Sequence, residues 1–394
     1  MGSASRHKPG LTLHRSQSHI SHQMQPKQQQ ATDGKLAKFF TGLAVILLSS
    51  FVISAFLSHW SLLDGAPRNS LRMFMDGNAH RPFAYRVLGP IVTNGMDSAL
   101  PAAAQSFLAD EVAPKFRTRY VEPLIAQYEQ RLPGVTNRAD RDWRDPEYRR
   151  TYVLMTMVIF ASFAGAMVFM RRSAILVGAD RTTANAVMLL YAAITPTMFL
   201  NGGYFYDFIE QLGACALVWC VLSRRWIVAF VALLLMQANK ETALLMVLFL
   251  APLGWHQERW QFVYKAAVAM VSCLIVFLLI RWQCASLAGQ STEWHLTENM
   301  VFWARQASWL ATEDFYSVDG YLPRMSFLLF ALASIAYGWY RGASSILVCA
   351  TLAFCVLAAL LLTMGFQDEF RNLSLSLPLL ALIWAERGSD VSWS

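Results

Sequence analysis

The residues best suited to chemistry lie in a polar stretch at 74–90, FMDGNAHRPFAYRVLGP, which follows soon after a long apolar run at 39–56. This stretch combines a carboxylate, two guanidinium groups and a phenol: Asp76, Arg81, Arg86 and Tyr85. Arginine side chains hold phosphate oxygens, and a carboxylate can take a proton from a hydroxyl as a general base. The combination predicts a site for a phosphorylated substrate with a polar head.

Comparable polar groups recur wherever other apolar runs are interrupted. Asp64 directly follows the first run, and further candidates come from the motifs NGGYFYDFIEQ, NKET and GFQDEFRN. These further candidates are Tyr204, Asp207, Asn239, Lys240, Glu241, Glu369 and Arg371. Ionisable groups near membrane depth are costly and by default mark a site.

The elements that must position these groups are apolar helices. The 394 residues are 55% hydrophobic and only 15% charged, whereas a soluble domain carries roughly 25% charged residues. Backbone groups in lipid must be satisfied within the segment, so we expect an all-α polytopic membrane protein. Its ten predicted spans are 39–60, 151–170, 183–201, 208–222, 226–239, 241–254, 262–282, 325–340, 344–364 and 373–386.

Basic residues in the short turns set the expected orientation. Lys and Arg collect in cytoplasmic loops, and this explains the net charge of +7 without nucleic acid, for which the chain has no motif. Arg171 and Arg172, the Ser-Arg-Arg turn at 223–225, and Arg259 fall at turns of one parity if both termini are cytoplasmic. All the polar clusters above then fall on the outer side.

The same pattern predicts the domain organisation. Residues 1–34 are polar and are expected to form a disordered cytoplasmic tail, followed by one transmembrane domain at 35–394 with outer loops at 61–150 and 283–324. Segment 83–104 is weakly apolar and is predicted to be amphipathic and interfacial. Residues 226–254 are predicted to form a hairpin of two short helices, with its tip inside the bundle.

Each motif also has a plainer structural explanation. Tyr85 and Arg86 also fit anchors for lipid headgroups, Asp207 fits a helix N-cap and Glu241 an early helical acid. The DEFRN motif also fits a surface turn whose acidic and basic side chains pair with one another. The six Cys lie in or beside apolar runs and are expected to pack as small apolar residues.

No cofactor is expected. His295 and Glu298 have a spacing that can bind a metal on a helix, but a solvated helix face explains them better. A divalent metal is compatible with the acids, although no ligand spacing supports one. The chain has no glycine-rich phosphate loop and so does not resemble an ATP-driven pump.

The motifs DGNAHRPFAYRVLGP, YFYDF, NKET and DEFRN resemble those of a group of bacterial inner-membrane proteins, from the first span to the last. That group in turn resembles the GT-C membrane glycosyltransferases, a fold-level analogy. The resemblance implies a large first outer loop with a catalytic acid, which here would be Asp76 or else Asp64. It also implies a polyprenyl-phosphate-linked sugar donor. Many GT-C enzymes show an acid pair or a soluble C-terminal domain, and this chain departs from them in ending soon after the tenth predicted span.

The leading hypothesis is therefore a glycosyltransferase of the bacterial inner membrane, active on the periplasmic side in cell-envelope glycan assembly. Arg81, Arg86 and Lys240 would bind the donor phosphate, with Arg371 as a further contact. Asp207, Glu241 and Glu369 would orient sugar hydroxyls or the basic groups, and Tyr85, Tyr204 and Asn239 would complete the substrate site. The expected partners are a polyprenyl-phosphate glycolipid and membrane lipids, and the oligomeric state is open. The alternatives are a transporter or flippase of glycolipid or solute, and a non-catalytic component of a polysaccharide assembly system.

Overall fold

The computed structural model describes residues 26–129, 133–199, 203–289, 294–304, 322–342, 344–365 and 370–386. The chain divides into two units, Met1–Ala44 and Val45–Ser394, and α1 (Pro26–Trp60) contributes residues to both. The described part of the first unit is helical from Pro26 onward, inside the segment predicted to be a disordered tail. Alanine, glutamine and lysine, which are good helix formers, dominate that stretch. Everything below concerns the second unit.

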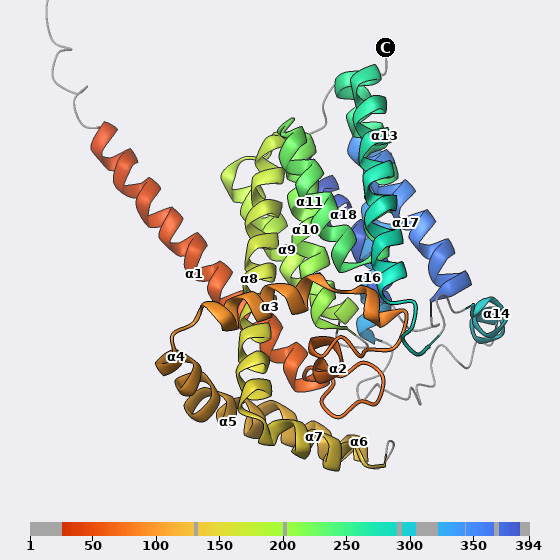
Figure 1. Ribbon diagram of the computed structural model, residues 1–394. Helices are drawn as coiled ribbons and strands as arrows, with labels where there is room; N and C mark the ends of the chain where they lie inside the picture. The colour runs from red at the N-terminus through yellow and green to blue at the C-terminus, as the bar shows by residue number, and fades with distance from the viewer. Residues whose placement is uncertain are drawn as a thin grey trace, which may run out of the picture. The chain divides into compact units, whose positions relative to one another are not determined.

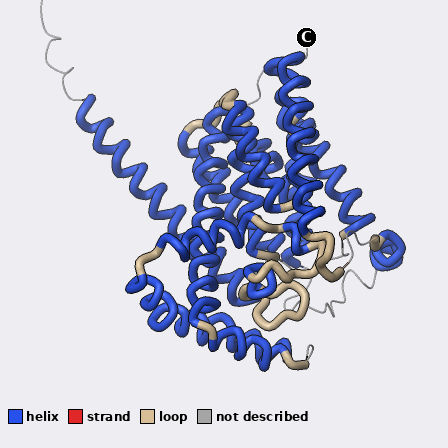
Figure 2. Tube along the Cα trace, in the orientation of Figure 1, coloured by secondary structure: helices blue, strands red, loops and turns tan. Residues whose placement is uncertain are grey.

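Within the described ranges the fold is helical, and its one β-bridge joins Arg81 to Gly289 (Figure 2). After α1, the segment predicted to be the first outer loop contains α2 (Leu71–Met75), η1 (Phe83–Tyr85), α3 (Leu88–Ala99), α4 (Ala102–Phe107), η2 (Leu108–Val112), α5 (Ala113–Phe116), η3 (Arg117–Val121), α6 (Glu122–Glu129) and α7 (Val135–Arg144). The bundle follows with α8 (Pro146–Leu176), α9 (Arg181–Phe199), α10 (Phe205–Leu222), α11 (Trp226–Asn239), η4 (Glu241–Leu244), α12 (Leu245–Phe249) and α13 (Ala251–Gln283). The last elements are α14 (Leu296–Ala304), α16 (Leu322–Arg341), α17 (Ser345–Met364), η5 (Phe370–Ser376) and α18 (Leu377–Ile383).

The core of the bundle is the packing of α10 against α8 and α11, with α9 beside α8 (Figure 1). Small residues permit the close approach, because a Cβ on Gly213 of α10 would lie 2.2 Å from the Met236 side chain of α11. Phe56 of α1 packs edge to face on Phe208 of α10. Helix α10 is thereby enclosed on several sides, and polar residues on it must find partners inside the protein.

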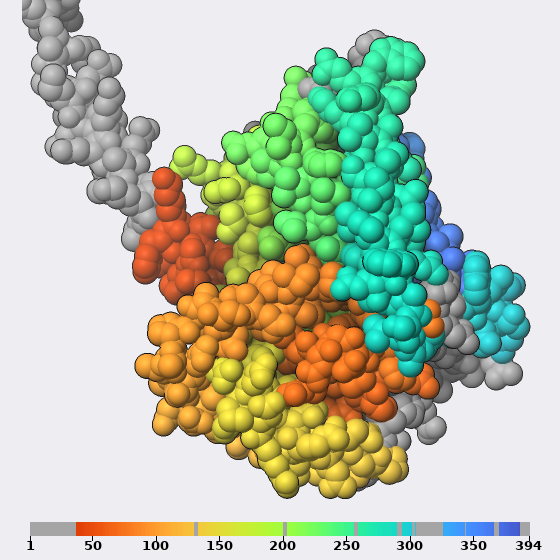
Figure 3. Space-filling view, in the orientation of Figure 1, coloured from red at the N-terminus to blue at the C-terminus, as the bar shows by residue number. Residues whose placement is uncertain are grey.

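The predicted outer loop at 61–150 is a layer of short helices. Figure 1 shows α2 to α7 gathered at one end of α8–α11, and Figure 3 shows the same segment as a continuous orange-to-yellow surface. The predicted amphipathic segment contains α3, which packs on α8 and exposes Ile91 and Val92. One face of α3 is therefore buried and one is apolar and exposed, as an interfacial helix requires.

Among the residues that the structure describes, five helical segments are long and apolar enough to cross a membrane, which is consistent with a membrane protein. They are Ala37–Trp60, Pro146–Leu176, Phe205–Leu222, Arg259–Gln283 and Ser345–Met364. The expectation of ten spans is met only in part. Two shorter apolar helices, Trp226–Asn239 and Phe370–Ile383, lie at predicted spans, and α9 and α16 lie at two more.

Two predicted spans have a different local structure. The segment at 241–254 is not one helix but η4, α12 and the start of α13, because the ion pairs of Lys240 and Glu241 hold the chain after α11 away from helical geometry. The segment at 373–386 begins as the 3-10 helix η5, in which the Ser376 hydroxyl bonds back to the Leu373 carbonyl. Such back-bonding competes with regular helix geometry.

Helix α13 bends sharply near its start. A Cβ on Gly254 would lie 2.1 Å from the ring of Phe262, yet residues eight apart in a straight helix are separated by about 12 Å. The chain therefore turns back between these residues, and the apolar span begins at Arg259. The bend falls in the turn that the sequence predicts around Arg259.

Candidate functional site

Three segments distant in sequence meet the N-terminus of α10. They are the chain at η1, the break after α11, and η5. The charged residues of these segments and of α10 form what we call the ion network: Arg86, Asp207, Glu210, Lys240, Glu241 and Arg371.

Lys240 is the centre of the network. Helix α11 ends there because Lys240 adopts an extended backbone (φ −162°, ψ 137°), which directs its ammonium toward α10. The Nζ atom donates to Asp207 Oδ1 at 3.2 Å and to Glu210 Oε2 at 2.9 Å. Lys240 and both carboxylates are buried. The ammonium therefore faces two acids, and the expected role of Lys240 at a donor phosphate has no support in this geometry.

The two acids have further partners that fix their orientation. Asp207 Oδ2 accepts from the backbone N–H of Tyr204 at 2.8 Å. Tyr204 is the N-cap residue of α10, so Asp207 caps the helix from its third position, as in a capping box, and not as the N-cap considered above. Glu210 Oε1 accepts from the Thr242 hydroxyl at 2.7 Å. Arg371 Nη1 lies 3.9 Å from Asp207 Oδ2, which joins η5 to the network.

Arg86 and Glu241 form the more exposed half of the network. Arg86 Nη2 donates to Glu241 Oε1 at 2.9 Å, and Arg86 Nη1 donates to the Pro82 carbonyl. Arg86 is buried, whereas the Glu241 side chain is 33% exposed. Arg86 Nε and Glu241 Oε2 are buried and have no hydrogen-bond partner within the described ranges.

Aromatic rings separate and cover the charges. The Arg371 guanidinium carbon lies 4.1 Å from the centre of the Tyr204 ring, and the Arg86 carbon lies 5.2 Å from that of Tyr206. The two tyrosine rings stack with centroids 5.0 Å apart. We call this stacked pair the aromatic wall. Asn69 donates to the Tyr204 hydroxyl at 2.7 Å, so the loop before α2 is attached to the aromatic wall.

The ion network is formally neutral, with three basic and three acidic side chains. Removing paired charges from water costs several kcal/mol per ion, and their mutual attraction offsets this only with good geometry and further hydrogen bonds. A packed bundle could replace such a network with apolar residues at little loss. Its presence inside apolar helices therefore favours a functional role.

The predicted catalytic acid Asp76 lies outside the network, at the exposed end of α2. Its side chain is 41% exposed, and Oδ2 accepts from Arg72 Nε at 2.8 Å. Arg72 also donates to Asp145 at 2.5 Å. Two residues before Asp76, the Phe74 ring packs on Phe205 and Tyr206. Asp76 is thus next to the aromatic wall of the network and open to solvent.

Asp64, the alternative acid, has a different environment. It is buried and accepts from Ser61 Oγ at 2.5 Å, Trp143 Nε1 at 2.9 Å and the Tyr148 hydroxyl at 2.7 Å. These bonds tie the end of α1 to α7 and α8. Since three donors already occupy the carboxylate, the geometry gives Asp64 a structural role.

The remaining predicted residues lie around the network. Arg81 Nη2 donates to the Gly289 carbonyl at 2.8 Å, and Tyr85 is buried in η1. Asn239 Nδ2 donates to the Tyr206 carbonyl at 2.8 Å, and its buried Oδ1 has no hydrogen-bond partner among the described residues. Glu369 lies outside the described residues, so its predicted role has no structural counterpart.

Two charged side chains of the candidate site were not among the residues predicted from the sequence to be catalytic or substrate-binding. Glu210 follows Asp207 by three residues, and this spacing places both on one face of a helix. The signal was therefore present in YFYDFIEQ. Arg72 precedes Asp76 by four residues, the spacing at which side chains pair on a helix. Helix α2 has only five residues, so no helical pattern in the sequence pointed to this pair.

The geometry bears little on metals. In the described portion of the chain, no group of three or more His, Cys, Asp and Glu is placed to hold an ion. The cysteines there are free, and five of the six are buried, in keeping with apolar packing.

Comparison with known proteins leaves the site to be interpreted from its own geometry. No family model matches the chain, and no curated protein or solved structure is significantly similar to it.

Proposed function

We propose that the chain is a membrane glycosyltransferase that moves a sugar from a polyprenyl-phosphate donor to an acceptor hydroxyl. The observation that carries the proposal is the meeting of four polar motifs at one end of apolar helices. The exposed Asp76 carboxylate lies two residues after Phe74, whose ring packs on Tyr206. Arg81 lies five residues before Arg86 of the ion network and donates to the Gly289 carbonyl.

In the proposed reaction, the Asp76 carboxylate removes the proton of the acceptor hydroxyl. The acceptor oxygen then forms a bond to the anomeric carbon of the sugar. The bond between that carbon and the phosphate oxygen breaks, and the polyprenyl phosphate leaves with the electron pair. Arg81 stabilises the charge that develops on the phosphate.

The ion network has a positioning role in this proposal. Helices α10 and α11 and the segment η5 are held together by the contacts of Lys240, Asp207 and Glu210. The aromatic wall therefore has one fixed orientation. Arg86 lies over the Tyr206 ring and Arg371 over the Tyr204 ring, and Glu241 pairs with Arg86. A sugar stacked on this wall would meet Glu241, whose Oε2 still has capacity for a hydroxyl donor.

The test is complementation of a strain that lacks the protein, with surface glycans and glycolipids measured by mass spectrometry. Asp76→Asn is expected to give the profile of the deletion strain at unchanged protein level, a loss of at least about 100-fold in transfer. Asp110→Asn is the matched control, because Asp110 is an exposed acid of the same loop paired to Arg149. Full complementation by Asp76→Asn would overturn the proposal.

A transporter is the second candidate, and the break at Lys240 favours it. Interrupted helices with ionisable residues at membrane depth are typical of secondary transporters. In that case Asp76→Asn would leave activity intact, and the pair Lys240 and Glu210 would carry the coupling ion. Loss of either function leaves the glycolipid accumulated with its sugar attached, so the Asp76→Asn variant distinguishes the two: it should reproduce the deletion profile for a transferase and complement fully for a transporter.

A further inference from the structure

We infer that the groove between α11 and α13 holds one acyl chain of an anionic phospholipid, with Lys265 at its phosphate. This site lies at the opposite end of the bundle from the ion network and does not depend on the proposed transfer activity. Along α10, Asp207 and Trp219 are separated by about 18 Å, and the groove extends past Leu217 and Val221 on the Trp219 side.

The groove is apolar and of suitable size for a chain. It has a volume of about 370 Å³, within the ~300–1,000 Å³ typical of small-molecule sites. Aliphatic and aromatic residues line it, among them Leu233, Val247, Leu250 and Val268. Of its lining side chains only Trp226, Tyr264 and Lys265 carry nitrogen or oxygen.

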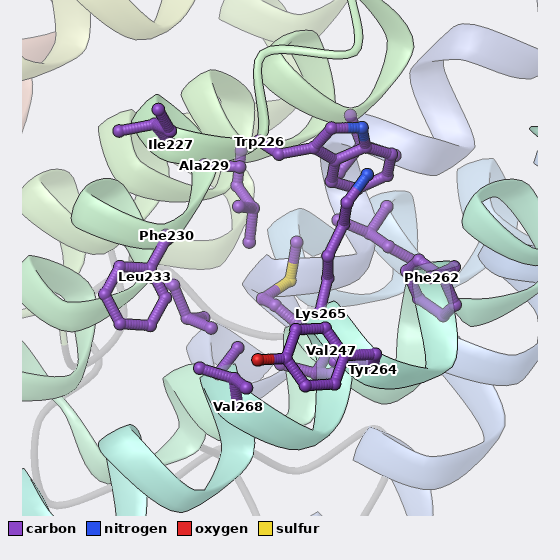
Figure 4. Close-up of a pocket in the computed structure, with 16 residues that line it drawn as sticks. Trp226, Ile227, Ala229, Phe230, Leu233, Val247, Phe262, Tyr264, Lys265 and Val268 are labelled. Carbon is purple, nitrogen blue, oxygen red and sulfur yellow. The ribbon is translucent and has the colours of Figure 1, made fainter. Parts of the chain in front are cut away.

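The single charge in the groove is positioned at one end. Figure 4 shows the Lys265 side chain extending to the indole of Trp226, with Nζ 4.5 Å from the ring centre. The apolar span of α13 begins at Arg259. Lys265 lies six residues later, which is about 9 Å along the helix. A lysine at this depth extends its ammonium to the headgroup region while its hydrocarbon stem lies on apolar surface.

Further cations lie over tryptophans, and one of them, Arg225, directly precedes Trp226 of the groove. Arg172 and Arg225 both lie over Trp219, at 5.9 and 4.7 Å, and Arg259 lies 5.4 Å from Trp255. Tryptophan marks the membrane–water interface. Basic residues at that depth attract anionic lipids. The positive charge at one end and the apolar groove beneath it match a phosphate and its acyl chain.

Native mass spectrometry of the purified full chain tests this, with phosphatidylglycerol and phosphatidylcholine as probes. The wild type is expected to retain phosphatidylglycerol in preference to phosphatidylcholine, and millimolar inorganic phosphate should not displace it. Lys265→Gln should lower phosphatidylglycerol occupancy about fivefold. Arg281→Gln is the control, because Arg281 lies at the other end of the same helix, and it should have no effect.

A second pair of variants examines the groove itself. Ala266→Phe fills the lining at a residue within the groove and should lower lipid retention, whereas Ala267→Phe adds the same ring at the next, exposed position and should not. The inference is overturned if the wild type retains both lipids equally, or if the members of either pair behave alike. Competition by inorganic phosphate alone would also overturn it, because the site would then recognise a free anion.

Discussion

At the scale of single residues, buried charge pairing distinguishes this chain from an ordinary helical bundle. Lys240 meets two carboxylates of α10, and Asp64 meets three donors, of which Trp143 and Tyr148 come from α7 and α8. The types of these residues were evident in the sequence, but their partners were not. A carboxylate of Asp64 saturated by Ser61, Trp143 and Tyr148 cannot be told from a reactive one without the fold.

Lys240→Met is expected to destabilise the protein by about 3–5 kcal/mol, because two buried carboxylates lose their counter-charge. The measurement is the melting temperature of the purified protein in detergent. Lys115→Met, at an exposed lysine, should change stability by less than about 0.5 kcal/mol. Adding Glu210→Gln to Lys240→Met should recover part of the loss. Equal melting of the two lysine variants would contradict the pairing.

At the scale of elements, short contacts between backbone segments position the site. Gly289 has a positive φ of 98°, and a Cβ there would lie 2.4 Å from the Arg81 carbonyl oxygen. The bridge at this glycine holds the segment that carries Arg81 and η1 against the end of α13. The outer loop depends on a comparable contact, in which Glu129 at the end of α6 binds the start of α7.

Gly289→Ala should therefore destabilise the protein by more than the roughly 1–2 kcal/mol that a positive φ alone costs, because the new Cβ would also clash with the Arg81 backbone, and it should weaken the site. Gly77→Ala is the control, since Gly77 also has a positive φ but has nothing within 4 Å of a Cβ; it should cost only about 1–2 kcal/mol. Thermal melting and complementation measure the two effects. If Gly77→Ala proves as harmful as Gly289→Ala, the close contact with Arg81 is not what matters.

The Glu129 contact should make stability depend on pH. The backbone N–H groups of Thr136 and Gly134 donate to the carboxylate and lower the pKa of Glu129. A lowered pKa stabilises the folded state above the ordinary pKa of about 4.3 and ceases to do so as pH falls through the folded value. The wild type should thus melt above Glu129→Gln at pH 7, and the gap should close below about pH 4. A gap that persists unchanged at acidic pH would count against the contact, and Glu111→Gln should follow the wild type throughout.

At the scale of the whole molecule, the fold places two chemically distinct ends on the bundle of the second unit. The ion network, α2 and the outer loop lie at the N-terminal end of α10, and the arginine–tryptophan pairs lie at its C-terminal end. The Lys and Arg of short turns favour the cytoplasm, so the first end should face outward.

Cysteine labelling of intact cells tests this sidedness. In a background with the exposed Cys355 changed to Ser, a membrane-impermeant maleimide should label Asn78→Cys and Glu111→Cys directly. Arg181→Cys should react only after permeabilisation. Asn78→Cys adjoins the proposed catalytic acid, so its protection in intact cells would end the proposal of an outward-facing site.

The sequence alone determined that this protein is helical, that several helices are apolar enough for a membrane, and which polar residues interrupt them. These properties are local, because the hydropathy of a short segment decides whether that segment is stable in water or in a membrane. The sequence did not predict that 241–254 is divided into η4, α12 and the start of α13. Ion pairs of Lys240 and Glu241 with other segments shape the chain there. Only the tertiary structure decided that Lys240 faces Asp207 and Glu210, that Asp64 is saturated and that Asp76 is open. A side chain's partner depends on which helix ends meet, and that is set by packing between segments far apart in the chain.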